Sequence, residues 1–220
     1  MGLLAYLLLS YLAIPAAWRL VEGRHPALDR VPQIARTGSN IPGDPLNIGL
    51  IGAEESVVRG MLAAGWFPAD RLTLASSLRI ASDSVLRRPY DDAPVSSLYV
   101  WGRKQDLAFE QPVGNDPRRR HHVRFWRSSE LDRHGSPLWI GAATFDVKVG
   151  FSHTTGQITH HIGPDVDAER DKILADLTHA ARVQVVDWQP RFHASLSGRN
   201  GGGDHWRTDG KLAVAVLVPD

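Results

Sequence analysis

The spacing of apolar residues changes from a helical period to a strand period about two-fifths of the way along the chain. Apolar residues recur at helical spacing over 53–64, which predicts a helix that ends at Gly65. Asp70 is then expected to be the N-cap of a second helix that continues to about Leu86. After Pro89, apolar and polar residues alternate, which is typical of strands.

Short connections rich in Gly, Pro, Asn and Asp separate these strand-like segments and predict antiparallel hairpins. The segments are 98–101, 107–109, 121–126, 138–149, 157–162, 183–188 and 211–218. A third helix is expected from Gly163 to about Arg182, with Pro164 at its first helical position. The pattern therefore predicts an α+β fold, in which an antiparallel sheet packs with helices on one face.

The N-terminus has a different character from the rest of the chain. Residues 1–18 carry no charged side chain and would form a helix of about 25 Å, just long enough to cross a bilayer. We interpret this N-terminal hydrophobic helix as a membrane anchor. A cleaved signal peptide, which would need a basic residue before the apolar run, and a buried helix are the alternatives. Arg19, Arg24 and Arg30 follow it, so the positive-inside rule predicts a single-pass protein with its main domain in the cytoplasm.

Composition narrows the remaining choices. Residues 19–50 are rich in Pro and Gly and read as a connector without long regular elements, so we expect a linker over 19–35 and a globular domain over 36–220. The chain has no cysteine, which excludes disulfides, thiolate chemistry and Cys-based zinc sites. Its net charge of +1 gives no overall electrostatic case for nucleic-acid binding.

Alternation in the three central strands predicts a group of polar side chains on one sheet face. The apolar residues of 121–126 must share a face, and the same rule separates polar from apolar residues on the next two strands. The predicted group is His122, Arg124, Asp146, Thr159 and His161. The partition is less clean on the second strand, because Leu138 and Ile140 share the parity of Asp146. The alternative is an ordinary solvated sheet face.

The densest run of titratable residues lies at 160–171, where a predicted strand meets a predicted helix. Its histidines and carboxylates can ligate a divalent metal, and Asp167 and Asp171 share a helix face. His160 and Asp167 are therefore the candidate ligands of a possible divalent metal cofactor. A local salt-bridge network around Arg170, or a direct catalytic role for one Asp, are the alternatives.

Two further segments allow more than one interpretation. The basic run 118–124, with Arg127, is short, and we favour an anionic lipid headgroup or a phosphoester over nucleic acid as its partner. A solvated strand start is the alternative. The glycine-rich run 200–204 is either a ligand-contacting loop or a long hairpin turn, and it lacks the lysine of a P-loop.

Several sequence motifs together resemble a known family. They are Ile-Pro-Gly-Asp-Pro-Leu-Asn at 41–47, Ala-Ala-Gly-Trp at 63–66, Pro-Tyr-Asp-Asp-Ala-Pro-Val-Ser at 89–96, Gly-Arg-Lys-Gln-Asp-Leu-Ala-Phe at 102–109, Arg-His-His-Val-Arg-Phe-Trp at 120–126, Thr-His-His-Ile at 159–162 and Asp-x-Glu-Arg-Asp at 167–171. In this order they resemble the LssY C-terminal domain family of bacteria, whose members are also fused behind DedA-like and phosphatidic-acid-phosphatase-type membrane domains. The resemblance covers roughly 36–220 and implies a membrane-proximal role in envelope or lipid biology. It carries over no catalytic residues, and here one hydrophobic segment replaces the multi-span portion.

The first functional hypothesis is a membrane-anchored domain whose polar pocket binds, and can hydrolyse, a phosphorylated or otherwise anionic substrate at the bilayer surface. The predicted catalytic residues are His122, His161 and Asp146, and the predicted substrate-binding residues are Arg124, Arg103 and Thr159. Either histidine would act as the general acid or base, and Asp146 would orient a histidine. The alternative is a non-catalytic sensor or adaptor for membrane or envelope partners, which include membrane lipids and membrane proteins but no nucleic acid.

Overall fold

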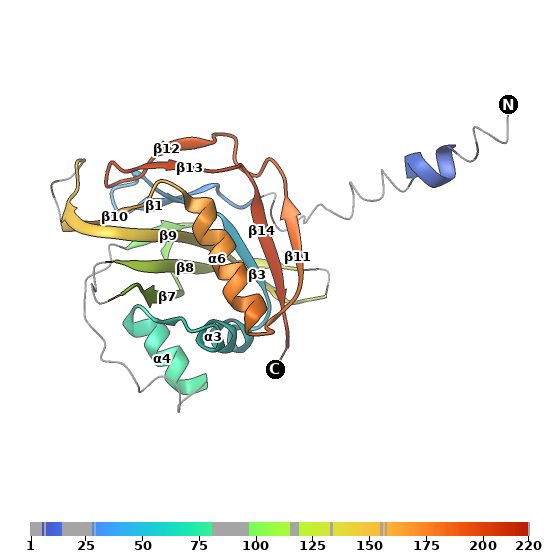
Figure 1. The fold of residues 1–220 in the computed structure, drawn as a ribbon, viewed down its shortest axis with the longest axis horizontal. Coiled ribbons are helices and arrows are strands. Elements are labelled where there is room, and N and C mark those ends of the chain that lie inside the picture. The colour runs from blue at the N-terminus through green and yellow to red at the C-terminus, as the bar shows by residue number, and fades with distance from the viewer. Residues whose placement is uncertain are drawn as a thin grey trace.

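An eight-stranded sheet forms the centre of the computed structural model, and helices cover one of its faces (Figure 1). The structure describes residues 6, 8–14, 28, 30–80, 97–114, 119–132, 134–154, 156 and 158–219. The strands of this sheet are β3 (Ile48–Ile51), β4 (Phe67–Pro68), β7 (Leu107–Pro112), β8 (Arg120–Leu131), β9 (Pro137–Phe151), β10 (Ile158–Ile162), β11 (Val183–Gln189) and β14 (Leu212–Leu217).

The order of strands is β11-β14-β3-β9-β8-β7-β4, and β10 pairs with the distal half of β9. One edge of β9 pairs with β8, while its other edge pairs first with β3 and then with β10. These pairs are antiparallel, and the pair β14–β3 is parallel. The α+β prediction is therefore confirmed. The sheet was predicted to be antiparallel, and the parallel pair β14–β3 departs from that prediction.

The helices on the covered face are α3 (Glu54–Ala63), α4 (Arg71–Ile80) and α6 (Val166–His179). Figure 1 shows α6 lying across the middle of the sheet. A hydrophobic core fills the space between these helices and the sheet, with Val57 and Met61 from α3, Ile173 and Leu177 from α6, and Phe125 from β8 among its members. Burial of apolar surface on this face is the main force that holds helices and sheet together.

A second, smaller sheet covers the opposite face. Its strands are β1 (Ile34–Thr37), β2 (Pro42–Pro45), β5 (Leu98–Val100) and β6 (Arg103–Lys104), in the order β2-β1-β5-β6. A second core lies between the two sheets and contains Leu138 and Ile140 of β9 together with Trp126 of β8. Leu138 and Ile140 lie on the same face of the sheet as Asp146. Apolar residues occur on that face because both faces of the large sheet are buried here.

The expected connector contains short strands but no long regular element. β1 and β2 lie within 19–50, and β3 begins there at Ile48 and occupies a central position between β14 and β9. The four residues of β3 are all buried, so they form a short apolar run without alternation. Such a run cannot be identified as a strand by its period, which is why the sequence did not predict β3.

The predicted end of the first helix is confirmed. Gly65 has a φ of +79°, its N–H donates to the carbonyl of Leu62 at 3.1 Å, and the N–H of Trp66 donates to the carbonyl of Met61 at 2.9 Å. This is the pattern of a Schellman cap, in which a left-handed residue stops the helix and turns the chain back.

For two glycines of this region, Gly65 and Gly60, we expect opposite effects on stability when each is replaced by alanine. Gly65→Ala should lower the free energy of unfolding by about 1 kcal/mol, because the left-handed conformation is unfavourable for a residue with a Cβ. Gly60 lies inside α3, and an added Cβ would meet Leu177 Cδ2 at an ordinary 3.4 Å. Gly60→Ala should therefore be neutral or stabilising by up to about 1 kcal/mol. Urea unfolding measures the free energy of unfolding of both variants. Equal changes in the two variants would contradict the assignment of Gly65 as the left-handed residue that ends the helix.

The other helix boundaries differ in part from the prediction. Asp70 caps α4, since its carboxylate accepts the N–H of Thr73 at 2.7 Å, while the predicted continuation through 81–86 lies outside the described residues. The N-cap of α6 is Asp165, so Pro164 precedes the cap instead of occupying the first helical position. Val166, which is buried, is the first residue of the helix. The Asp165 side chain accepts the N–H of Ala168 and so satisfies a backbone donor at the start of the helix.

Only part of the predicted N-terminal hydrophobic helix is described. Residues Leu9–Ala13 form a short π-helical turn, and residues 1–5, 7 and 15–18 of the predicted anchor lie outside the described residues. Across the described ranges, no helix combines the length and the apolar character needed to cross a bilayer.

Candidate functional site

The polar side chains of β8 and β9 are buried between the two sheets. His122 is 0 % exposed, Asp146 is 3 % exposed and Arg124 is 7 % exposed. These three side chains share the sheet face that alternation predicted for them, and the small sheet covers that face. A solvated sheet face is therefore excluded at these positions.

A pocket of about 290 Å³ lies beside this cluster. Its walls come from the small sheet, from β8 to β10 and from the turn that joins β12 (Ser197–Arg199) to β13 (His205–Arg207). The ionisable side chains in its lining are Asp44, Arg124, Asp146 and His160, and the Asn200 amide also lines it. Thr159 lines the pocket as well, whereas His122 and His161 do not.

Arg120 organises the floor of this cluster. Its guanidinium donates to Glu110 Oε2 at 2.6 Å and to Asp146 Oδ2 at 3.1 Å, and it lies 3.2 Å from Nε2 of His160. The residue is 4 % exposed, so these contacts are formed in a desolvated environment where charge pairing is strong. Arg120 therefore fixes the side chains of Asp146 and His160 at the pocket wall.

Two buried carboxyl groups in the lining hold their protons more tightly than usual. Burial raises the pKa of Asp146 to about 6, against the opposing charges of Arg120 and Arg124. Burial also raises the pKa of Asp44, which the charge of Arg124 and the hydrogen bond from Asn200 oppose. The Asp44 carboxylate accepts from Arg124 Nη1 at 3.4 Å and from Asn200 Nδ2 at 3.0 Å. Asp146 can thus exchange a proton close to neutral pH.

Two histidines of the cluster, His122 and His160, have pKa values below their ordinary value. Burial, and then the charges of Arg124 and Arg120, lower the pKa of His122 well below its ordinary value. Among the described residues, neither ring nitrogen of His122 has a hydrogen-bond partner. Burial and the same two arginines lower the pKa of His160 to about 4. The carboxylate of Asp146 accepts from Arg120, so it does not orient a histidine as predicted.

His161 holds the turn above the pocket. Its Nδ1 lies 2.7 Å from Asp204 Oδ1, while Asp204 Oδ2 accepts the N–H of Ile162 at 3.1 Å. His161 is 4 % exposed, and its ring is tilted against the ring of His153 with the centroids 5.4 Å apart. His161 thus attaches β10 to the β12–β13 turn without lining the pocket itself.

The glycine-rich run is both a hairpin turn and part of the pocket. The N–H of Asn200 donates to the carbonyl of Asp204 at 3.0 Å, and Asn200 Oδ1 accepts the N–H groups of Gly202 and Asp204, each at 3.0 Å. A Cβ on Gly201 would lie 2.5 Å from Thr37 Cγ2, so only glycine allows the turn to pack this closely on β1. The interpretation of this run as a hairpin turn is confirmed, and a contact with a ligand stays a prediction.

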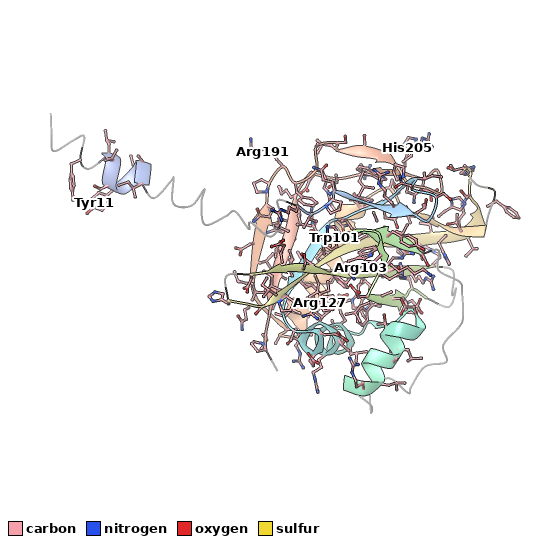
Figure 2. The ribbon with its side chains drawn as sticks, turned by 180° about the vertical axis from the view of Figure 1, so that it is seen from behind. Tyr11, Trp101, Arg103, Arg127, Arg191 and His205 are labelled. Atoms are coloured by element: carbon pink, nitrogen blue, oxygen red, sulfur yellow. The ribbon has the colours of Figure 1, made fainter. Side chains whose placement is uncertain are left out.

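Arg103 does not reach the pocket. Its guanidinium donates to the Asp106 carboxylate and to the backbone carbonyl of Arg127, and it lies 5.8 Å from the centroid of the Trp101 ring. Figure 2 shows Trp101, Arg103 and Arg127 grouped together. Trp101 and Gly102 both have positive φ and form the tight turn between β5 and β6, which carries Arg103 to the edge of the small sheet.

The acidic run on α6 forms a salt-bridge network. Arg170 donates to Asp171 at 2.8 Å, to Asp209 at 2.9 Å and to Asp167 at 3.1 Å, and it lies 4.8 Å from the centroid of the Trp188 ring. This confirms the structural alternative for Asp167. His160 instead contacts Arg120, and within the described part of the chain no three His, Asp or Glu side chains are grouped to hold a metal ion.

The basic run divides between the two faces of β8. Arg120 and Arg124 are buried, whereas Arg119 and Arg127 are exposed, and Arg118 lies outside the described residues. His121 points to the helix face, where its Nδ1 lies 2.7 Å from Glu169 Oε2. Strand alternation therefore splits this run, and it does not form one basic surface.

Sequence reasoning missed Asp44 and Asn200 as pocket residues. Asp44 lies on β2, in the run 41–47 that helps to carry the family resemblance, and Asn200 opens the glycine-rich turn. Both reach the pocket only because β2 and the β12–β13 hairpin fold over the large sheet. The sequence showed the motif and the turn separately, but it did not show that they contact each other in the fold.

Comparison with known proteins gives one match. A family model described as LssY C-terminus matches residues 28–212, which include every strand and helix from β1 to β13. No curated protein and no solved structure matches the chain.

Proposed function

We propose that this chain, which belongs to the LssY C-terminus family, binds the anionic group of a small phosphorylated molecule in its pocket. The observation that supports this proposal is the Arg124 side chain, a guanidinium that is 7 % exposed and lines a pocket of about 290 Å³. Arginine binds phosphate oxygens through a planar fork of donors, and these hydrogen bonds are strengthened away from bulk water.

Other groups of the lining assist this binding. Asn200 contributes an amide to the lining, and its turn adds the backbone of Gly201 and Gly202. Asp44 and Asp146 oppose an anion while they are ionised, but burial raises the pKa of both carboxyl groups. Protonation of Asp146 therefore removes one negative charge when an anion enters.

The direct test is calorimetric titration of the full chain with sulfate, a tetrahedral anion that does not titrate near neutral pH. Arg124→Gln should weaken binding about tenfold or more, because a charged hydrogen-bond donor is lost. Arg119→Gln changes an exposed arginine five residues earlier and should leave the affinity unchanged. A folded Arg124→Gln protein with wild-type affinity would contradict the proposal. If that variant does not fold, saturable sulfate binding by the wild type at one site decides.

The pH dependence of sulfate binding has a defined sign. An anion beside Asp146 raises its pKa above the ligand-free value of about 6, so binding takes up a proton. Affinity should be constant below pH 6 and fall by up to about tenfold per pH unit above it. The groups that face Asp146 are Arg120, Arg124 and Asp44, and a raised pKa of Asp44 acts in the same direction. Affinity that rises with pH, or an unchanged profile in Asp146→Asn, would show that Asp146 is not involved.

Hydrolysis of the bound phosphoester is a second candidate function, favoured by the proton affinity of Asp146 at the pocket wall. In this reaction the Asp146 carboxylate takes a proton from water, and the resulting hydroxide forms a bond to phosphorus while the bond between phosphorus and the ester oxygen breaks. The ester oxygen then takes this proton from Asp146 and leaves as an alcohol. Phosphoesters are assayed with and without divalent metals. Asp146→Asn should lower the rate about 100-fold or more. Equal background rates in both proteins would leave the non-catalytic sensor or adaptor.

Membrane attachment of the domain is part of this proposal and rests on the apolar character of residues 1–18. The full chain should sediment with membranes, whereas a chain without residues 1–18 should be released. Cell fractionation with an antibody to the globular domain measures both forms. Equal solubility of the two forms would remove the anchor from the account and leave the pocket untouched.

A further inference from the structure

We infer that the ligand of this pocket carries hydroxyl groups beside its anionic group, so that it is a phosphate monoester of a small polyol. This inference rests on the proposed function and names its substrate class. It follows from three properties of the pocket: the balance of charges in its lining, the hydroxyl groups of that lining and its size.

The charges of the lining do not suit an anion alone. Within the described lining, Arg124 is the only lysine or arginine, and the charges of both Asp44 and Asp146 act on it. Inorganic phosphate at Arg124 would present mainly negative oxygen atoms to these two carboxyl groups, and only its P–OH hydrogens could be donated to them. A polyol phosphate places its phosphate at the guanidinium and donates its hydroxyl hydrogens to the carboxylates, which removes this conflict.

Both carboxylates are held in position and retain capacity to accept. Asp44 Oδ1 accepts from Asn200 and Oδ2 accepts from Arg124, while Asp146 Oδ2 accepts from Arg120. An ionised carboxylate offers about four lone-pair positions, so each can still accept a ligand hydroxyl. Groups whose partners already fix them bind a ligand with little further loss of conformational freedom.

The rest of the lining is rich in hydroxyl groups. The hydroxyl-bearing residues are Thr37, Ser39, Ser97, Ser152 and Thr159. Leu98 and Ile162 are the apolar side chains of the described lining. Hydroxyl groups donate and accept, which suits a polyol, and two apolar residues do not make a channel for an acyl chain. A volume of about 290 Å³ lies at the lower limit of ordinary small-molecule sites, so the ligand is small.

Calorimetric titration of the full chain with three probes tests this inference. The probes are glycerol 3-phosphate, propyl phosphate and inorganic phosphate. Propyl phosphate matches glycerol 3-phosphate in charge and in carbon and phosphate framework but lacks its hydroxyl groups. Glycerol 3-phosphate should bind about tenfold or more tightly than either other probe, because two hydroxyl contacts to carboxylates are gained. Asp44→Asn should reduce this preference to about threefold or less while propyl phosphate still binds.

Each result decides a different point. Equal affinity for glycerol 3-phosphate and propyl phosphate overturns the polyol inference and leaves the anion pocket intact. No binding of any probe overturns the proposed function itself. Dihexanoyl phosphatidic acid is the lipid arm: binding as tight as that of glycerol 3-phosphate would assign the pocket to a lipid headgroup with its chains, against the inference. If Asp44→Asn does not fold, the comparison of probes on the wild type is sufficient.

Discussion

Arg120→Ala should lower the free energy of unfolding by about 3–5 kcal/mol at pH 7.5, because it removes the cation that pairs with the buried carboxylate of Asp146 and the partly buried carboxylate of Glu110. Asp146 and Glu110 both accept from the Arg120 guanidinium, at 3.1 Å and 2.6 Å. Asp146 is 3 % exposed and cannot recover these contacts from water. Urea unfolding followed by circular dichroism measures the loss.

The effect of Arg120→Ala should also depend on pH. Burial already raises the pKa of Asp146 to about 6, and removal of a neighbouring cation raises it further. A carboxyl group whose pKa is raised in the folded state destabilises that state only at pH values at which the same group is ionised in the unfolded chain. The loss should therefore be smaller at pH 5 than at pH 7.5. Arg119→Ala removes an exposed arginine and should change stability by less than about 0.5 kcal/mol at either pH. Equal losses for the two variants would refute the buried charge cluster.

Asn47→Ala should destabilise the fold by about 3 kcal/mol or more, because it removes three hydrogen bonds to buried backbone groups. Asn47 is 0 % exposed; its Nδ2 donates to the carbonyls of Ala143 and Val166 at 3.0 Å and 2.7 Å, and its Oδ1 accepts the N–H of Ala143 at 2.9 Å. These bonds join the start of β3 to β9 and to the first turn of α6. Asn47 thus attaches the helix layer to the sheet at one point.

Urea unfolding and amide hydrogen exchange measure this effect together. The amide of Ala143 should lose protection in Asn47→Ala, while amides in the middle of α3 should change only with global stability. Gln111→Ala is the matched control, since its amide makes one exposed contact with the carbonyl of Gly65 at 3.4 Å. A variant that is as stable as the wild type would show that Asn47 does not join these layers.

The apolar pattern predicted the longer strands and the first helix. β9 and β14 lie close to their predicted ranges, β8 continues from its predicted end at 126 to Leu131, and α3 ends at its predicted glycine. β3 escaped prediction because it has four residues that are all buried, and so short an apolar run lacks the alternation that identifies a strand. In the small sheet, β5 was predicted at 98–101, whereas β1, β2 and β6 escaped prediction because they are short and because β2 contains proline and glycine.

The candidate site divides in the same way. Alternation placed His122, Arg124 and Asp146 on one face because neighbours on paired strands share a face. It could not identify Asp44 or Asn200, whose approach depends on how separate segments pack. Two further expectations depended on tertiary contacts of the same kind. Arg103 was expected at the pocket, but a tight turn carries it away, and Asp146 was expected beside a histidine where Arg120 takes that position.

The central claim is that Arg124 receives an anion inside the pocket between the two sheets. A crystal structure of the full chain with bound glycerol 3-phosphate tests this most directly. We expect a phosphate oxygen about 2.7–2.9 Å from a guanidinium nitrogen of Arg124, with the ligand hydroxyls toward Asp44 or Asp146. A ligand seated on the exposed arginines 119 or 127, with the pocket filled only by water, would contradict it.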